Sequence, residues 1–330
     1  MVKNVSSRIK IKWNIFCRPE MTFNSKGRSM GLAFNRHSIP RSNPDTDSNQ
    51  GDVASGDSGW RAGIAVELKY MDGHTRMGRT RHYGPLRIQR PFWPEGKDLA
   101  HLYILHPPGG LVAGDELIQS FEAHSGASGL VTTPAAGKVY FNGNGRLQKQ
   151  LTSMVVQDNA CLEWLPQETI IFNGAEAELN TSIELDGNGC YAGWDIVCLG
   201  RKASGEAFEQ GRVIQNLHLT RNDQPLYRER LELAAGSPLA QSVLGLNGQH
   251  VFGTLLMTFE QDPGCDHLHE RLEACGGSKC TAITWRNGVF IARYLGSSPE
   301  QARTLFTWLW NELRGQLNGR KGCKPRIWNT

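Results

Sequence analysis

Alternation of apolar and polar side chains dominates the chain from residue 60 to about residue 260 and predicts many short β-strands. Runs of this kind occupy 64–70, 128–133, 179–185 and 212–219. Turns rich in glycine and asparagine, 142–145 and 186–189, separate them. No βαβ rhythm appears, so we expect a stack of β-sheets. The pair Gly143 and Gly145 predicts a hairpin turn, because a phosphate-binding loop would require a helix after it.

Helical patterns are confined to the C-terminal part. Ser298-Pro-Glu-Gln301 has the form of a capping box, and the apolar stripe that follows predicts a helix over 298–315, ended by Gly315. A weaker helical pattern covers about 264–275. Between the two helices, residues 282–295 predict a hairpin that turns at Asn287-Gly288.

Composition restricts the class of protein. With 330 residues and 39% hydrophobic content, the chain can bury a substantial core. No apolar run approaches the roughly 20 residues that cross a bilayer, so we expect no membrane partner. The eight cysteines are scattered without a Cys-x-x-Cys pair. They are typical of reduced thiols, and we expect a cytoplasmic protein.

Charge is distributed unevenly. Residues 1–41 contain nine Lys and Arg and one acid. The remainder therefore holds 36 − 9 = 27 basic and 32 − 1 = 31 acidic residues, which gives no argument for nucleic-acid binding. Residues 42–58 are polar and poor in apolar side chains. We predict a disordered, basic and polar extension over 1–58, with a transit peptide or upstream coding sequence as alternatives, and a single domain over 59–330.

A shaped turn stands out at 106–115, where His106-Pro-Pro-Gly109-Gly110 leads through Gly114 to Asp115. Its prolines and glycines exclude helix and regular strand. We expect Pro107 to fix His106 in place, with a functional role as the alternative because His106 borders the turn that presents Asp115. A second segment, Thr132 to Tyr140, contains Lys138. Neither segment fits a motif in general use for metal, nucleotide or nucleophile chemistry.

These segments resemble the urease accessory protein UreD (UreH) family, from about Gly59 to the last residue. Further ordered blocks carry the resemblance: Gly84-Pro-Leu86, Gln89 to Glu95, Leu162 to Ile170, Gly193-Trp-Asp195, Cys198-Leu-Gly-Arg201 and Pro325 to Thr330. The sequence departs from the family pattern at Ala113, where glycine is usual, and over Gly137-Lys-Val-Tyr-Phe141, where Ser/Thr-Lys-Phe-Tyr-Arg is typical, so that Phe141 replaces an arginine. The resemblance implies a mainly β fold of stacked sheets, a β-helix-like body, with two α-helices toward the C-terminus.

Three carboxylates are predicted to point inward. Glu229 shares strand parity with apolar neighbours, Asp195 lies in a strand that is apolar on both faces, and Asp115 shares parity with Leu117. A buried ionised acid is costly unless it is paired, hydrated or bound to a cation. By resemblance, all three line a water-filled passage, with Glu168 as a weaker fourth candidate. The alternative is inert ion pairing with the cations Arg90, Lys138 or Arg201.

The family resemblance also implies a function. It is that of a non-enzymatic maturation factor that binds apo-urease, recruits UreF and the GTPase UreG, and passes Ni²⁺ along the carboxylates. Carboxylates and water bind Ni²⁺ weakly and exchangeably, so we expect transient Ni²⁺, no tight metal site and no bound cofactor. An exposed part of the C-terminal helix and the last residues is the predicted docking surface for partners: Trp308, Trp310, Arg326 and Trp328.

Two other hypotheses remain open. A structural zinc site is conceivable at Cys265, His267 and His269 with Cys275 and Cys280, although the usual ligand spacings are missing. A β-helical carbohydrate-active hydrolase or lyase, with Asp115 and Glu168 as acid and base, is the rival from another class. Such an enzyme should have an open groove lined by aromatic residues.

Overall fold

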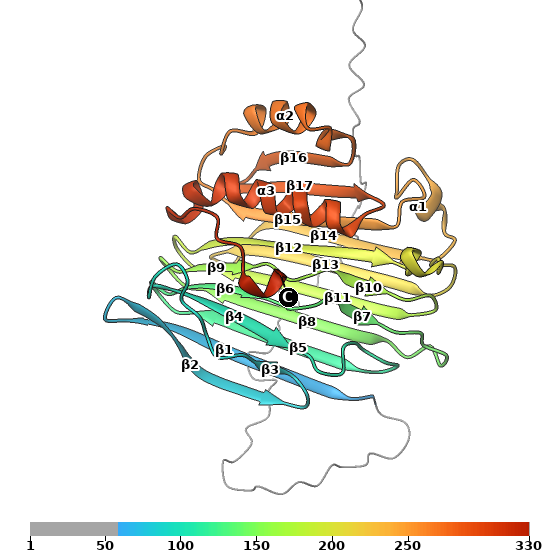
Figure 1. Cartoon of the computed structure of the whole chain (residues 1–330), viewed down its shortest axis with the longest axis horizontal. Coiled ribbons are helices and arrows are strands. Elements are labelled where there is room, and N and C mark those ends of the chain that lie inside the picture. The colour runs from blue at the N-terminus through green and yellow to red at the C-terminus, as the bar shows by residue number, and fades with distance from the viewer. Residues whose placement is uncertain (1–58, 330) are drawn as a thin grey trace, which may run out of the picture. The chain divides into compact units, whose positions relative to one another are not determined.

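The computed structural model describes residues 59–329, and the predicted extension 1–58 lies outside the described residues. Two β-sheets face each other (Figure 1). The first sheet contains, in spatial order, β14 (Gln224–Ala234), β13 (Arg212–Arg221), β11 (Glu176–Leu185), β8 (Gln148–Val156), β5 (Glu116–Ala123), β1 (Arg61–Met71) and β2 (His74–Tyr83). The second contains β16 (Thr281–Arg286), β17 (Val289–Gly296), β15 (Val251–Thr258), β12 (Cys190–Leu199), β9 (Cys161–Trp164), β6 (Ser128–Thr132), β4 (Leu99–Leu105) and β3 (Arg87–Ile88). Two short strands extend it, since β10 (Thr169–Ile171) pairs with β12 and with β7 (Gly137–Val139).

The chain rises through the stack by alternating between the sheets. Strands β5, β8, β11 and β13 run parallel in the first sheet, and β6, β9 and β12 run parallel in the second. The predicted turns at 142–145 and 186–189 therefore lie at corners where the chain changes sheet. The prediction of a hairpin at Gly143 and Gly145 is wrong, because β7 and β8, which flank this turn, belong to different sheets. A turn sequence specifies a reversal of direction but not the hydrogen-bonding partner of the next strand.

Two apolar cores hold the layers together. One fills the space between the sheets, where Phe121 and Trp164 pack with ring centroids 5.7 Å apart. The other lies between the outer face of the second sheet and the helices, and Trp194 on β12 packs there against Phe306 of α3 (Pro299–Asn318). In Figure 1, α3 and the C-terminal segment cross the face of the second sheet. The predicted fold class is thus confirmed.

The helices largely follow the predictions. The second helix, α2 (Cys265–Ala274), agrees with 264–275, whereas the one-turn α1 (Pro238–Gln241) was not predicted. The Ser298 hydroxyl caps α3 by accepting a hydrogen bond from the Gln301 amide at 3.1 Å. The predicted end at Gly315 is wrong, because the helix continues to Asn318 and ends at Gly319, whose φ is +74°. Three 3₁₀ turns, η1 (Lys202–Ser204), η2 (Gly277–Lys279) and η3 (Arg326–Asn329), complete the elements.

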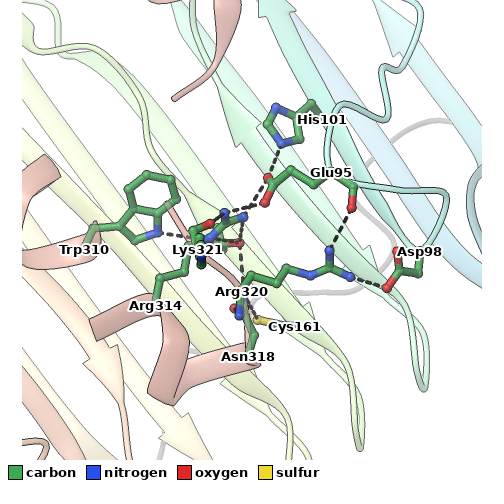
Figure 2. A network of polar contacts seen from close by, with 10 residues as sticks. Glu95, Asp98, His101, Cys161, Trp310, Arg314, Asn318, Arg320 and Lys321 are labelled. Carbon is green, nitrogen blue, oxygen red and sulfur yellow. Dashed lines mark hydrogen bonds and ion pairs between the residues drawn. The ribbon is translucent and has the colours of Figure 1, made fainter. Parts of the chain in front are cut away.

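A buried arginine holds α3 against the second sheet and the loop between β3 and β4 (Figure 2). The Arg314 side chain is fully buried and bonds two carboxylates, with Nη2 at 2.8 Å from both Glu163 Oε1 and Glu95 Oε1. Trp310 Nε1 donates to Glu163 Oε2 at 2.6 Å, and His101 bonds Glu95 at 2.7 Å. We call these five residues the Arg314 network. Every charge in it has an opposite charge and several hydrogen bonds, which is the condition for tolerating charges at this depth.

Candidate functional site

A row of polar side chains crosses the inner face of the first sheet. Register pairing aligns Gln119, Thr152, Thr181, Leu217 and Glu229 on five neighbouring strands. At about 4.8 Å per strand, the row spans roughly 19 Å. All but Leu217 are polar, although they face the space between two sheets that is otherwise filled by apolar side chains. We call this set the inner polar row.

Asp195 faces this row from the second sheet. Its Oδ2 accepts a hydrogen bond from the Thr181 hydroxyl at 2.9 Å, and its Oδ1 accepts a longer one from Trp164 Nε1 at 3.4 Å. Both partners are neutral, so the carboxylate receives no ion pair from them. Burial, and more weakly the charge of Glu229, raises the pKa of Asp195 above its ordinary 3.8, although the bonds from Thr181 and Trp164 act the other way. The predicted inward orientation is confirmed.

Glu229 closes the row at β14, the edge strand of the first sheet. The Tyr227 hydroxyl donates to Glu229 Oε2, and the Thr254 hydroxyl donates to the same oxygen at 3.2 Å. Arg293 Nη2 lies 3.6 Å from Glu229 Oε1. Thr254 is also the cross-strand register partner of Asp195, so the threonine that bonds Glu229 lies next to Asp195 on the neighbouring strand. The inward side of β14 predicted for Glu229 is confirmed.

A cavity of about 120 Å³ adjoins the other end of the row. Gln119 and Gln150 line it from the first sheet, Trp164 from the second, and His106 from the shaped turn. The Gln119 Oε1 and Thr152 Oγ1 atoms are buried and accept no hydrogen bond from the described protein. Buried polar atoms of this kind are normally satisfied by water or an ion. The cavity, which Gln119 lines, can therefore accommodate water or a small hydrated species.

The shaped turn lies at this cavity, and its glycines are structurally required. Gly109 has φ +77°, and a Cβ on Gly110 would lie 2.5 Å from a ring carbon of Tyr140. Asp115 accepts backbone N–H bonds from Trp60 and Val112, each at 2.9 Å. Its carboxylate thus secures the turn and the start of β1.

His106 is half-buried at the cavity. Burial lowers the pKa of His106, and the charge of Asp115 opposes that shift. Asp115 therefore acts electrostatically on a residue that lines the cavity, in addition to securing the turn. Gly114, in the same turn as His106, has φ +82° and packs against Gly59, which lies just before β1.

The three cations that the ion-pair alternative paired with the inward acids have other surroundings. Arg201 pairs with Glu206 and stacks on Phe172, with its guanidinium carbon 4.4 Å from the ring centroid. Arg90 is exposed, and Lys138 lines the cavity. Instead, Arg293 faces Glu229, and Arg303 of α3 pairs with Glu168 at 2.6 Å. Ion pairing therefore accounts for Glu168 and in part for Glu229, but not for Asp195.

The rival hypotheses find little support in the geometry. Asp115 and Glu168, the proposed acid and base of a carbohydrate-active enzyme, are engaged with backbone amides and with Arg303, respectively. In α2, His267 and His269 are exposed while Cys265 is buried. Among residues 59–329, no three His, Cys, Asp or Glu side chains gather as metal ligands.

The predicted docking residues have different surroundings. Trp310 is 0% exposed and belongs to the Arg314 network, so its assignment to an exposed surface is wrong. Trp328 is half-buried, donates to Thr132 Oγ1 at 2.8 Å and packs on Trp194. Arg326 is exposed.

Trp308 alone of the three tryptophans lines a groove, of about 710 Å³, between α2 and α3. Arg271 of α2 stacks on its ring, with the guanidinium carbon 5.1 Å from the centroid. Arg271 also pairs with Glu312, one turn further along α3. The groove therefore has an apolar wall with charged residues at its rim.

Sequence reasoning missed several residues of these sites. Glu163 lies between apolar neighbours in a strand buried on both faces, which is the signal that identified Asp195. No local sequence pattern pointed to Gln119, Thr152 or Arg293, because their place in the site depends on cross-strand register and on the facing sheet.

Comparison with known proteins gives consistent matches. Residues 61–329 match the family model described as UreD urease accessory protein. A protein named urease accessory protein UreD from Saccharophagus degradans is 42% identical over 277 residues, covering 82% of this chain and 93% of the relative. A protein of the same name from Chromohalobacter salexigens is 42% identical, and the match covers 85% of this chain and 95% of the relative. One from Pseudoalteromonas translucida is 44% identical, and the match covers 78% of this chain and 85% of the relative. No helix in the described part of the chain has the length and apolar character needed to span a membrane.

Proposed function

The chain belongs to the urease accessory protein UreD family, and from that premise we propose that it is a non-enzymatic factor for urease maturation that passes Ni²⁺ along its inner polar row. The observation that carries the proposal is the polar lining of an otherwise apolar inter-sheet space, with two carboxylates, Glu229 bonded by Thr254 and Asp195 on the strand beside Thr254. Hydroxyls, amides and carboxylates are hard or borderline oxygen donors that bind Ni²⁺ loosely. A conduit must release its cargo, and this donor set favours release.

The proposed path has two ends. One is the cavity beside His106 and Gly110, and the other is the open edge at β14, where Arg293 and Tyr227 lie. Asp115 is near the first end, where its charge acts on His106. Along the way Gln119 and Thr152 offer unsatisfied oxygens to a hydrated cation. Glu168 pairs with Arg303 of α3 and is not among the residues that line this cavity, so it has a weaker claim to contact the cargo.

The test uses urease maturation in cells. Urease subunits, UreF and UreG are co-expressed with the wild-type chain, with Asp195→Asn or Glu229→Gln, or with no chain, and the nickel content of purified urease is measured. Both substitutions keep the shape and remove the charge, so we expect intact complexes but nickel-poor urease. Glu232→Gln is the matched control, because Glu232 is on the outer face of β14. Full nickel loading with both inner variants would refute the passage, and full loading without the chain would refute the maturation role.

For partner binding, we propose that UreF docks at the groove that contains Trp308, with exposed Arg326 contributing at the C-terminus and UreG and apo-urease joining through the assembled complex. Aromatic and arginine side chains dominate binding energy at interfaces, and Arg271 beside Trp308 gives the groove both. A pull-down with Trp308→Ala should lose UreF. Trp285→Ala, on the β16–β17 hairpin, is the control. Retention of UreF by Trp308→Ala at wild-type levels would exclude the groove.

A further inference from the structure

Arg293 occupies the open edge of the inter-sheet space. The first sheet ends at β14, whereas the second continues beyond β15 to β17, which carries Arg293 on its inner face. The side chain is 39% exposed, yet its Nη2 donates to the Tyr227 hydroxyl at 2.9 Å and lies 3.6 Å from Glu229 Oε1. One arginine thus stands between the inner polar row and solvent.

The contacts of Arg293 are loose in comparison with those of Arg314. Arg314 is fully buried and bonds two carboxylates at 2.5 to 3.2 Å, a geometry that fixes it in place. In the described part of the chain, Arg293 faces one carboxylate, beyond direct hydrogen-bonding distance, and its buried Nε has no hydrogen-bond partner there. A partly exposed ion pair of this kind contributes little to stability. Arg314 is therefore held rigidly, whereas displacing Arg293 from Glu229 costs little free energy.

We propose that Arg293 is a displaceable counterion that closes the edge of the inner polar row and competes with a divalent cation for Glu229. This inference rests on the proposed function, because the cation is its cargo. When the row is empty, the guanidinium neutralises Glu229 through space and through the Tyr227 hydroxyl. A divalent cation between Asp195 and Glu229 supplies the same neutralisation, so the guanidinium is free to swing outward. Arg293 thereby lowers the affinity of the row and prevents it from retaining the cation.

Electrostatics around the pair agree with an exchange of cations. Within residues 59–329, the groups that face Glu229 are Tyr227 on its own strand, Thr254 on β15 and Arg293 on β17, with Asp195 acting on it from β12. Arg293 is the one positive charge among them. Removing that charge leaves two carboxylates near Thr254 without a cation. They then bind a divalent cation more tightly, and they repel each other more strongly when no cation is bound.

The experiment measures Ni²⁺ binding to the purified full chain by titration calorimetry. Arg293→Met should tighten Ni²⁺ binding about fivefold, equivalent to about 1 kcal/mol. Arg293→Lys keeps a positive charge and should restore affinity close to wild type. Arg286→Met, on the neighbouring strand with an exposed side chain, should have no effect. Adding Glu229→Gln to Arg293→Met should cancel the gain, because the competition is for that carboxylate.

The outcomes separate the inference from the function on which it rests. If Arg293→Met binds Ni²⁺ as wild type does while Asp195→Asn weakens binding, the row carries the cation and the counterion role is overturned. If neither Asp195→Asn nor Glu229→Gln changes Ni²⁺ binding, the row is not a cation path and both ideas fall. Thermal melting of each variant without metal verifies that it is folded.

Discussion

Substituting Arg314 by methionine should destabilise the protein by about 4 kcal/mol. Arg314 is 0% exposed, and its removal leaves Glu163, also 0% exposed, without a cation, while Glu95 keeps only His101. Removing one partner of a buried ion pair typically costs about 3–5 kcal/mol, because the remaining charge has lost both water and its counterion. Methionine fills most of the volume, so the loss reports the uncompensated charge rather than a cavity.

The assay is urea denaturation at neutral pH, which gives the free energy of unfolding for each variant. Arg286→Met removes an exposed arginine and should change this free energy by less than about 0.5 kcal/mol. Adding Glu163→Gln and Glu95→Gln to Arg314→Met removes the stranded charges and should recover part of the loss. A decrease below about 1 kcal/mol for Arg314→Met would refute the view that this network holds α3 on the sheets. Failure of the triple variant to recover any stability would show that packing, not charge, caused the loss.

Three further predictions follow from single sites. Gly110→Ala should lower the free energy of unfolding by about 1–3 kcal/mol, because its methyl group would lie 2.5 Å from a Tyr140 ring carbon, and urea denaturation beside Gly143→Ala tests this. Burial raises the pKa of Glu95, but bonds from His101 and Arg314 outweigh burial and hold it below its ordinary 4.5. Its stabilisation should be complete above about pH 4.5 and lost as pH falls through the lowered pKa, and this dependence should vanish in Glu95→Gln. Burial raises the pKa of Asp195, so the stability that its protonated form contributes is lost as pH rises through that pKa. At pH 7, Asp195→Asn should therefore melt at a higher temperature than wild type. A lower melting temperature would contradict the cost assigned to this carboxylate.

Much of the architecture was predictable because it rests on local rules. Side-chain alternation located β1, β6, β11 and β13, and Asn287-Gly288 located the β16–β17 turn, where both residues have positive φ. Strand parity correctly predicted that Glu229 points inward, since successive side chains of any strand alternate between faces. Family motifs then identified the chain more firmly than any single physical pattern could.

Tertiary structure decided which residues meet. The corner at 142–145 was taken for a hairpin because the turn sequence does not specify which sheet receives the next strand. Trp310 was expected at the surface, but the acid that binds it, Glu163, comes from a strand 147 residues earlier in the chain. The role proposed for Arg293 depends on its position opposite Glu229, which belongs to the other sheet. The sequence by itself located these strands and turns and the inward side of Glu229. Cross-strand register and sheet facing, which depend on contacts between distant segments, decided the inner polar row and the Arg314 network.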